Sequence, residues 1–115
     1  MAAAARPLRE AARRGVVWSS GWPHFLPRLQ GVAALRLGRV DEAVERLERA
    51  ILTARNSGAL PEEARCRLDL ARAVDTRGAR DDRGRAIGLA QSAADAFASL
   101  GLLPFVRRAA GFLGR

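Results

Sequence analysis

The sequence of 115 residues predicts an all-α protein made of antiparallel helical hairpins. Apolar residues recur at steps of three and four through most of the chain, which is the period of a helix with one buried side. Alanine is abundant while only 5% of residues are aromatic, a composition that suits close packing between helices better than strands. Glycines follow the apolar runs, at the positions where a helix ends in a left-handed residue.

The first predicted region, residues 1–23, precedes the hairpins. Residues 2–14 are rich in Ala and Arg and are expected to form a helix that Pro7 interrupts. Gly, Ser and Pro then break the helical pattern and predict a linker. Its tryptophans, Trp18 and Trp22, are expected to cover the end of the first hairpin, with exposed contact residues as the alternative.

The second predicted region, residues 24–113, opens with a helix over 24–37. Proline is tolerated in a helix only within the first turn, so Pro27 places the start near this position. Gly38 follows the last apolar residue and is expected to end the helix, because glycine adopts a left-handed backbone without strain.

A second helix is expected over 41–57, returning antiparallel to the first. Asp41 and Glu42 lie in its first turn, where carboxylates meet the positive end of the helix dipole. Gly58 is expected to end this helix. Its apolar residues form one stripe: Ala43, Val44, Leu47, Ala50, Ile51 and Ala54.

The second hairpin follows the same plan. Pro61 opens a helix that is expected over 61–77 and that ends at Gly78. A polar turn separates it from a fourth helix over 85–100, which Gly101 caps.

The last predicted element is a capping helix over 104–113. Its apolar residues include Phe105, Phe112 and Leu113. We expect this helix to lie as a lid on the second hairpin.

The two hairpins share a spacing of small residues. Gly38 and Gly78 each close the first helix of a hairpin, 40 residues apart. Helix pairs at a fixed period are typical of solenoids, in which each unit buries its face on its neighbours. Two sets of residues resemble the tetratricopeptide repeat (TPR): Gly31, Gly38, Asp41, Ala43, Leu47 and Ala50, then Leu70, Ala71, Gly78 and Ala86. The resemblance implies a short, right-handed, TPR-like solenoid.

A narrower resemblance covers residues 24–113. The strings A-R-C-R-L-D-L-A-R-A-V-D-T-R-G, D-R-G-R-A and F-A-S-L-G-L are similar to the C-terminal repeat region of bacterial adenylate/guanylate cyclase-like proteins and LuxR-type ATPase regulators. This resemblance implies a module of a bacterial signalling or transcription regulator. Pro27 and Ala34 stand where the TPR pattern has aromatic residues, and cyclase, ATPase and DNA-binding motifs are missing. The resemblance therefore implies an architecture and no catalytic residue.

Motifs of catalysis and metal binding are missing from the sequence. It has no G-x-x-x-x-G-K-[ST] loop, no H-E-x-x-H and no G-x-S-x-G, and its single His and single Cys are His24 and Cys66. We therefore expect no enzyme activity, no cofactor and no metal. The single Cys fits a reducing compartment, and no apolar run has the ~18 residues of a membrane span. We expect a cytoplasmic protein without a membrane partner.

The candidate binding surface is the outer face of the first helix of each hairpin. In TPR proteins these helices line a concave groove, and the resemblance maps nine residues to it: Phe25, Arg28, Val32, Leu35, Arg36, Arg65, Leu68, Arg72 and Asp75. Guanidinium groups hold carboxylates while apolar residues fill pockets, so we expect an acidic peptide or protein segment as the partner. The alternative is that these Arg side chains are the solvated face of a basic protein, whose net charge is +8.

Two further functions remain as alternatives. A nucleic-acid site would use the same Arg surface and lose affinity steeply with salt. The acidic segment 41–63 and the lack of stacking aromatics beside the Arg argue against it. The other alternative is a homodimer through the terminal helices, in which the helix over 104–113 stacks on a second copy. The chain would then be a self-associating fragment of a larger cyclase or ATPase regulator.

Overall fold

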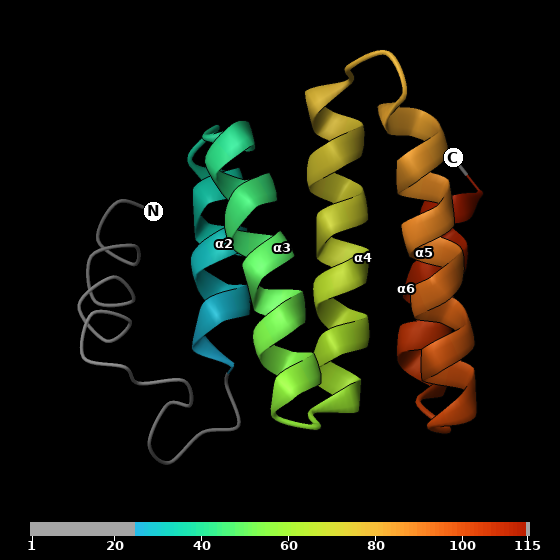
Figure 1. Ribbon diagram of the computed structural model, residues 1–115. Coiled ribbons are helices and arrows are strands. Elements are labelled where there is room, and N and C mark those ends of the chain that lie inside the picture. The colour runs from blue at the N-terminus through green and yellow to red at the C-terminus, as the bar shows by residue number, and fades with distance from the viewer. Residues whose placement is uncertain (1–24, 115) are drawn as a thin grey trace.

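The computed structural model describes residues 25–114, and this range is helical without a strand. The helices are α2 (Leu26–Arg36), α3 (Val40–Asn56), α4 (Leu60–Arg77), α5 (Asp82–Ser99) and α6 (Leu103–Leu113) (Figure 1). The all-α prediction is confirmed. The expectations for residues 1–23 and for His24, including the roles of Trp18 and Trp22, lie outside the described residues.

Each helix expected between residues 24 and 113 is present, with ends within one or two residues of those predicted except at the start of α5. This helix begins at Asp82 rather than at Arg85. The Asp82 carboxylate accepts hydrogen bonds from the Ala79 N–H at 2.8 Å and from the Arg77 guanidinium at 2.8 and 2.9 Å. These hydrogen bonds hold Asp82 close to the end of α4. The helix α5 therefore begins three residues earlier than predicted, and its first turn includes residues that the sequence pattern assigned to a loop.

A glycine follows the end of each helix that leads into a turn. Gly38, Gly58, Gly78 and Gly101 all have positive φ, between 66° and 78°. After three of these glycines the next N–H bonds back into the preceding helix, as Ala59 does onto α3 at 2.9 Å. This arrangement satisfies carbonyl groups that a helix end leaves without partners. The predicted glycine ends are confirmed.

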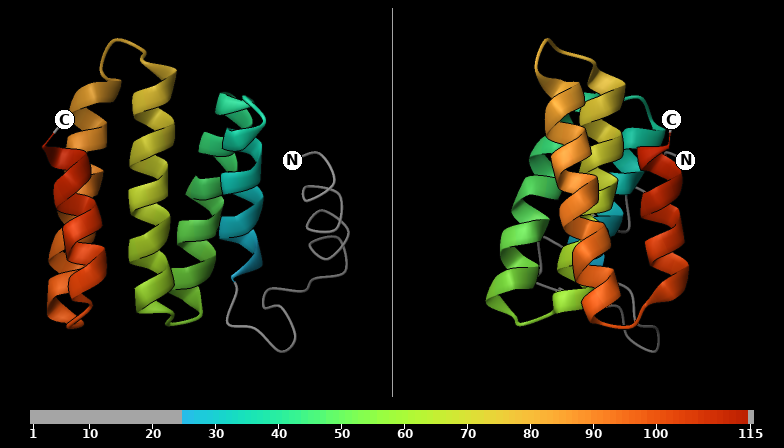
Figure 2. Two further views of the ribbon diagram at one scale, coloured as in Figure 1. Left: turned by 180° about the vertical axis from the view of Figure 1, so that it is seen from behind. Right: turned by 90° about the vertical axis from the view of Figure 1, so that its right-hand side faces the viewer.

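The helices α2, α4 and α6 begin with the same dipeptide: Leu26-Pro27, Leu60-Pro61 and Leu103-Pro104. Proline is favoured in the first turn, where its missing N–H has no intrahelical partner to lose. The N-termini of these three helices lie at the same end of the molecule (Figures 1 and 2). They are therefore equivalent first arms, and α3 and α5 are the returning arms.

The helices form two sides of the molecule. Helices adjacent in the chain pack as antiparallel neighbours, and α2 also contacts α4. In Figure 2, α3 and α5 lie toward one side and α2 and α6 toward the other, with α4 between them. We call the side made by α2, α4 and α6 the first-arm face, and the side made by α3, α4 and α5 the second-arm face.

Small side chains allow the helices to approach closely. Alanine is the commonest residue of the buried core that runs from α2 through α6. A Cβ atom on Gly31 would lie only 2.5 Å from Leu47 Cγ, so α2 and α3 meet at a distance that glycine alone permits. A smaller cluster joins Phe25 and Cys66 to two alanines of α3. The core therefore holds α4 rigidly between its neighbours and fixes the side chains that it presents.

Candidate functional site

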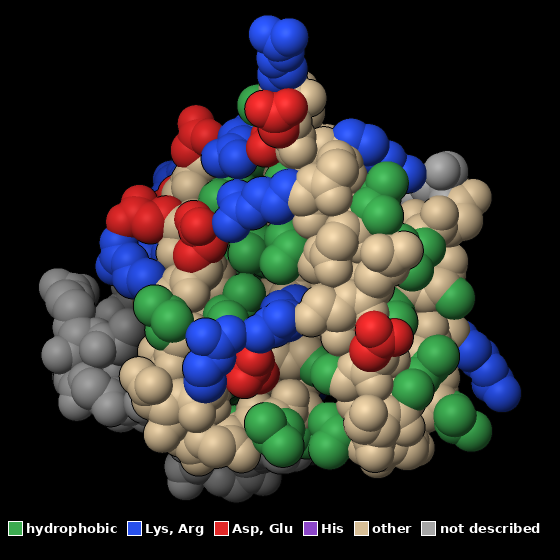
Figure 3. Space-filling model, turned by 45° about the vertical axis from the view of Figure 1, so that its right-hand side comes forward, with side chains coloured by type: hydrophobic (Ala, Val, Ile, Leu, Met, Phe, Trp, Pro, Cys, Tyr) green, Lys and Arg blue, Asp and Glu red, His purple; other side chains and the backbone are tan. Residues whose placement is uncertain are grey.

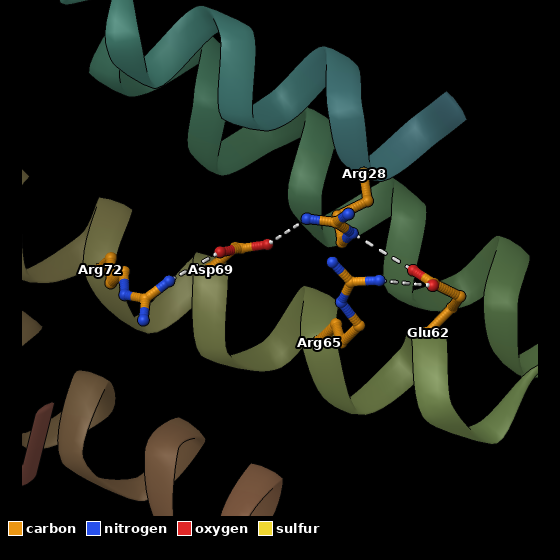
Figure 4. Close-up of polar contacts among 5 residues, drawn as sticks. All are labelled: Arg28, Glu62, Arg65, Asp69 and Arg72. Carbon is orange, nitrogen blue, oxygen red and sulfur yellow. Dashed lines mark hydrogen bonds and ion pairs between the residues drawn. The ribbon is translucent and has the colours of Figure 1, made fainter. Parts of the chain in front are cut away.

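A buried arginine links α2 to α4 on the first-arm face. Arg28 donates a hydrogen bond from Nε to Glu62 Oε2 at 3.2 Å and another from a terminal nitrogen to Asp69 Oδ2 at 3.1 Å (Figure 4). Its side chain is only 9% exposed. Because a buried charge needs partners, the two carboxylates stabilise Arg28 in this position.

Two further arginines complete a chain of alternating charge on α4. Arg65 donates to the second oxygen of Glu62 at 3.1 Å, and Arg72 donates to the second oxygen of Asp69 at 3.1 Å. Glu62 and Asp69 are seven residues apart and so share one side of the helix, and each arginine follows its acid by three residues. The order of contacts is therefore Arg65, Glu62, Arg28, Asp69, Arg72, as drawn in Figure 4. We call these five residues the arginine network.

The arginine network continues toward α6 through an aromatic ring. The guanidinium carbon of Arg65 lies 5.1 Å from the centre of the Phe105 ring, and that of Arg108 lies 4.9 Å from the same centre. Phe105 itself stacks on Phe97 of α5 with ring centres 5.1 Å apart. Cations over a ring face are held by its negative charge density. This contact places two guanidinium groups on one half-buried aromatic residue.

Positive charge exceeds negative charge on the first-arm face. Within the arginine network, three guanidinium groups share the carboxylates of Glu62 and Asp69. Arg36, at the C-terminal end of α2, and Arg108 on α6 add two cations, and neither has an ion pair with any of the residues 25–114. The face therefore carries a net positive charge, and Glu62 and Asp69 are already engaged in ion pairs.

The structure places the nine residues predicted for the groove in three different environments. Phe25, Arg28 and Leu68 are buried. Val32, Leu35, Arg65, Arg72 and Asp75 are half-buried, and Arg36 is exposed. The expectation that the first three contact a ligand is therefore corrected, because Phe25 and Leu68 pack in the interior and Arg28 is enclosed by its ion pairs.

The predicted residues are not all brought together. Arg28, Arg65 and Arg72 meet in the arginine network. Asp75 instead accepts a hydrogen bond from Arg83 of α5 at 3.1 Å, so its carboxylate is directed to the α4–α5 pair. Phe25 lies in the smaller apolar cluster with Cys66.

Sequence reasoning missed four residues of this site: Glu62, Asp69, Phe105 and Arg108. The sequence pattern places Glu62 in the first turn of a helix and Phe105 among the apolar residues of the capping helix, and neither position indicates a contact with an arginine. A usable signal was present, because Glu62 and Asp69 lie seven residues apart and each precedes an arginine by three. Their partner on α2 lies 34 and 41 residues away and cannot be found from local spacing.

Cys66 and the acidic side chains are the groups in the described part of the chain that catalysis or metal binding would draw on. Burial and, as a smaller cause, the charge of Asp69 raise the pKa of the Cys66 thiol to about 12, so the thiolate is disfavoured at neutral pH. Residues 25–114 contain no group of three or more His, Cys, Asp or Glu side chains placed to hold a metal ion.

The second-arm face carries contacts of a different kind. Figure 3 shows a shallow hollow on this side, where basic side chains reach across a hydrophobic floor. Arg85 of α5 pairs with Glu48 of α3 at 3.0 Å, and Arg67 of α4 donates to the Ser92 hydroxyl of α5 at 2.7 Å. The first contact links α5 to α3 and the second links α4 to α5, so these polar groups of the second-arm face are paired with each other.

Comparisons of the chain with protein-family models, with curated proteins and with solved structures find no match. Within residues 25–114, no helix has the length and apolar character needed to cross a bilayer.

Proposed function

We propose that this chain is a non-enzymatic helical-repeat module that binds an acidic segment of a protein on its first-arm face. In this proposal α2–α3 and α4–α5 are two TPR-like hairpins of a short right-handed solenoid, and α6 is the capping helix. The Leu-Pro starts of α2, α4 and α6 support it, since they mark equivalent ends of successive arms. The cytoplasmic, bacterial signalling or transcription context is proposed from the sequence resemblance alone.

The observation that carries this proposal is the charge balance of the first-arm face. Glu62 and Asp69 are each shared between Arg28 and one surface arginine, so two carboxylates face three guanidinium groups and leave a net positive charge. Arg65 and Arg72 are held in defined orientations but remain partly exposed, with 29% and 38% of their side chains accessible. Held guanidinium groups lose less conformational entropy on binding a carboxylate than free ones do.

Apolar side chains stand beside these cations. Val32 and Leu35 on α2 and Phe105 on α6 are half-buried, so each keeps a surface that a ligand can cover. Acidic segments that also carry apolar residues would contact both kinds of side chain. This combination favours a peptide over a polyanion without apolar groups.

Binding of a defined peptide tests the proposal. The probe is a fluorescein-labelled peptide of alternating Glu and Leu, measured by fluorescence anisotropy beside a peptide in which Gln replaces Glu. Arg36→Glu with Arg108→Glu is expected to weaken binding of the acidic peptide at least about tenfold, because neither cation has an ion-pair partner among residues 25–114 whose loss would disturb folding. The Gln peptide is expected to bind weakly to every variant.

The matched control makes the same charge change elsewhere. Arg39→Glu with Arg80→Glu alters two exposed side chains in the α2–α3 and α4–α5 turns. If both double variants weaken binding equally, the acidic peptide is attracted only by the net positive charge of the protein, and the first-arm face is not the binding site. Failure of the acidic peptide to bind the unmodified chain would also remove the proposal.

The two alternatives predict other results. A nucleic-acid site would bind single-stranded oligonucleotides with a steep loss of affinity between about 50 and 200 mM salt. A homodimer through the terminal helices would show twice the monomer mass in light scattering, and Arg36→Glu with Arg108→Glu would leave peptide binding unchanged.

A further inference from the structure

Exposed leucines gather at one end of the molecule. Among residues 25–114 the large hydrophobic side chains that are exposed are Leu52, Leu60, Leu100 and Leu103, with 55%, 57%, 38% and 59% of their surfaces accessible. Leu52 lies in the last two turns of α3, Leu60 starts α4, and the other two flank the turn between α5 and α6. These turns lie at the same end of the molecule in Figures 1 and 2. We call this end the leucine end.

The leucines at this end are not part of the core. Leu60 and Leu103 occupy the same position in their helices, directly before the proline of the first turn. The equivalent residue of α2, Leu26, is buried. Single exposed leucines are common on proteins, but four at one end form a patch that the packing of the described helices does not explain.

Cations without carboxylate partners adjoin these leucines. Arg107 and Arg108 follow Leu103 within about one turn of α6 and have no ion pair among the described residues. The start of α6 has neither an acidic residue in its first turn nor a side-chain cap, so its N–H groups add positive charge.

The acids near the leucine end are mostly engaged. Glu62 is held by Arg28 and Arg65, and Glu63 by Arg55 and Arg67. The exposed carboxylate of α5, Asp95, lies about one turn farther from the end. The opposite end has a different character, since Asp41 and Asp81 are exposed there beside arginines. The leucine end is therefore both apolar and basic.

We propose that the leucine end docks on an anionic lipid surface, with Leu60 and Leu103 entering the interfacial region and Arg107 meeting lipid phosphates. A second copy of the chain is a poorer occupant, because a symmetric contact through this end would bring like charges of α6 together without carboxylates to pair them. An anionic bilayer offers an apolar layer below negative headgroups and so meets both kinds of side chain. The expectation of no membrane partner was based on the lack of a spanning segment, which a peripheral contact does not need.

Vesicle binding of the full chain tests this proposal. Phosphatidylcholine vesicles with and without phosphatidylserine are sedimented with the protein, and the bound fraction is measured. Binding is expected only with phosphatidylserine and is expected to fall as salt rises. Leu60→Ser with Leu103→Ser is expected to weaken it by about tenfold per leucine, since each apolar side chain then no longer leaves water. Arg107→Gln is expected to weaken it by about fivefold.

The control is Leu37→Ser, which changes a half-buried leucine at the opposite end of α2. Thermal unfolding of each variant confirms that it is folded before binding is compared. The proposal is overturned if no vesicles are bound, if the leucine pair and the control behave alike, or if neutral vesicles bind equally well. It is also overturned if light scattering shows a dimer that the leucine pair dissociates, because the second copy would then be the occupant.

Discussion

Replacing Arg28 tests how the arginine network holds α2 on α4. Arg28→Leu puts a shorter, apolar side chain into a site where the guanidinium is enclosed by two carboxylates. Glu62 and Asp69 are then left with only their second arginine partners, Arg65 and Arg72. These two carboxylates are themselves mostly buried, with 10% and 13% of their side chains exposed, so solvent compensates little for the loss.

The expected loss of stability follows from the removal of one of the two arginine partners of each carboxylate. Removing one partner of a buried ion pair destabilises a protein by about 3–5 kcal/mol, chiefly because the other charge stays buried without compensation. Each carboxylate here keeps one arginine, so we expect a value at the low end, about 3 kcal/mol. For a domain of this size 1 kcal/mol corresponds to about 4–8 °C in Tm, so Tm should fall by about 12–24 °C.

Urea and thermal unfolding followed by circular dichroism measure this effect. Arg36→Leu, an exposed change on the same helix, is the control and should alter stability by less than about 0.5 kcal/mol. Adding Glu62→Gln and Asp69→Asn to Arg28→Leu removes the stranded charges and should restore at least half of the loss. An Arg28→Leu variant as stable as the control, or a triple variant less stable than Arg28→Leu alone, would show that the arginine network does not hold α2 on α4 in this way.

Three further predictions concern packing, acid stability and thiol reactivity. Gly31→Ala should destabilise the protein by about 1–3 kcal/mol, because its Cβ would lie 2.5 Å from Leu47 Cγ. Gly88→Ala, whose Cβ would have no atom within 4 Å, should stabilise the helix by up to about 1 kcal/mol. Urea unfolding compares the two variants, and equal effects would contradict the close packing of α2 on α3. The hydrogen bond from the Arg77 side chain lowers the pKa of Asp82 from 3.8 to about 2, so the contribution of the Asp82 carboxylate to stability is complete above about pH 4 and is lost as pH falls toward 2. Asp82→Asn should therefore reduce the loss of stability between these pH values. A pH profile of stability that the substitution leaves unchanged would contradict this role of Asp82. The Cys66 thiol, with its pKa raised to about 12 by burial, should react with a thiol reagent at pH 8 only as the protein unfolds, and rapid labelling of the native chain would show that it is accessible.

The helices could be predicted from the sequence because their ends are set by local chemistry. Gly38, Gly58 and Gly101 adopt the left-handed backbone that stops a helix, and Pro27 and Pro61 mark first turns. These effects involve residues close in the chain, so periodicity and position are enough to find them. The start of α5 was placed too late because it depends on side-chain hydrogen bonds across the turn.

The candidate site could be predicted only in part, since its geometry depends on contacts between distant helices. Spacing identified Arg65 and Arg72 as neighbours on one side of a helix. It could not show that Arg28 turns inward, because the carboxylates that hold it come from α4. Nor could it show that Arg108 shares a ring with Arg65, since α6 meets α4 only after the hairpins have packed.

Mapping the acidic peptide onto the folded chain tests the proposed recognition surface most directly. In nitrogen–proton correlation spectra recorded during titration with the alternating Glu and Leu peptide, we expect the largest shifts in the backbone and guanidinium signals of Arg36, Arg65, Arg72 and Arg108. Signals of Arg85 on the second-arm face and Arg80 in the α4–α5 turn are expected to stay unchanged. Shifts centred on α3 and α5, or a spectrum unaffected by the peptide, would contradict the proposal that α2, α4 and α6 form a binding surface for acidic segments.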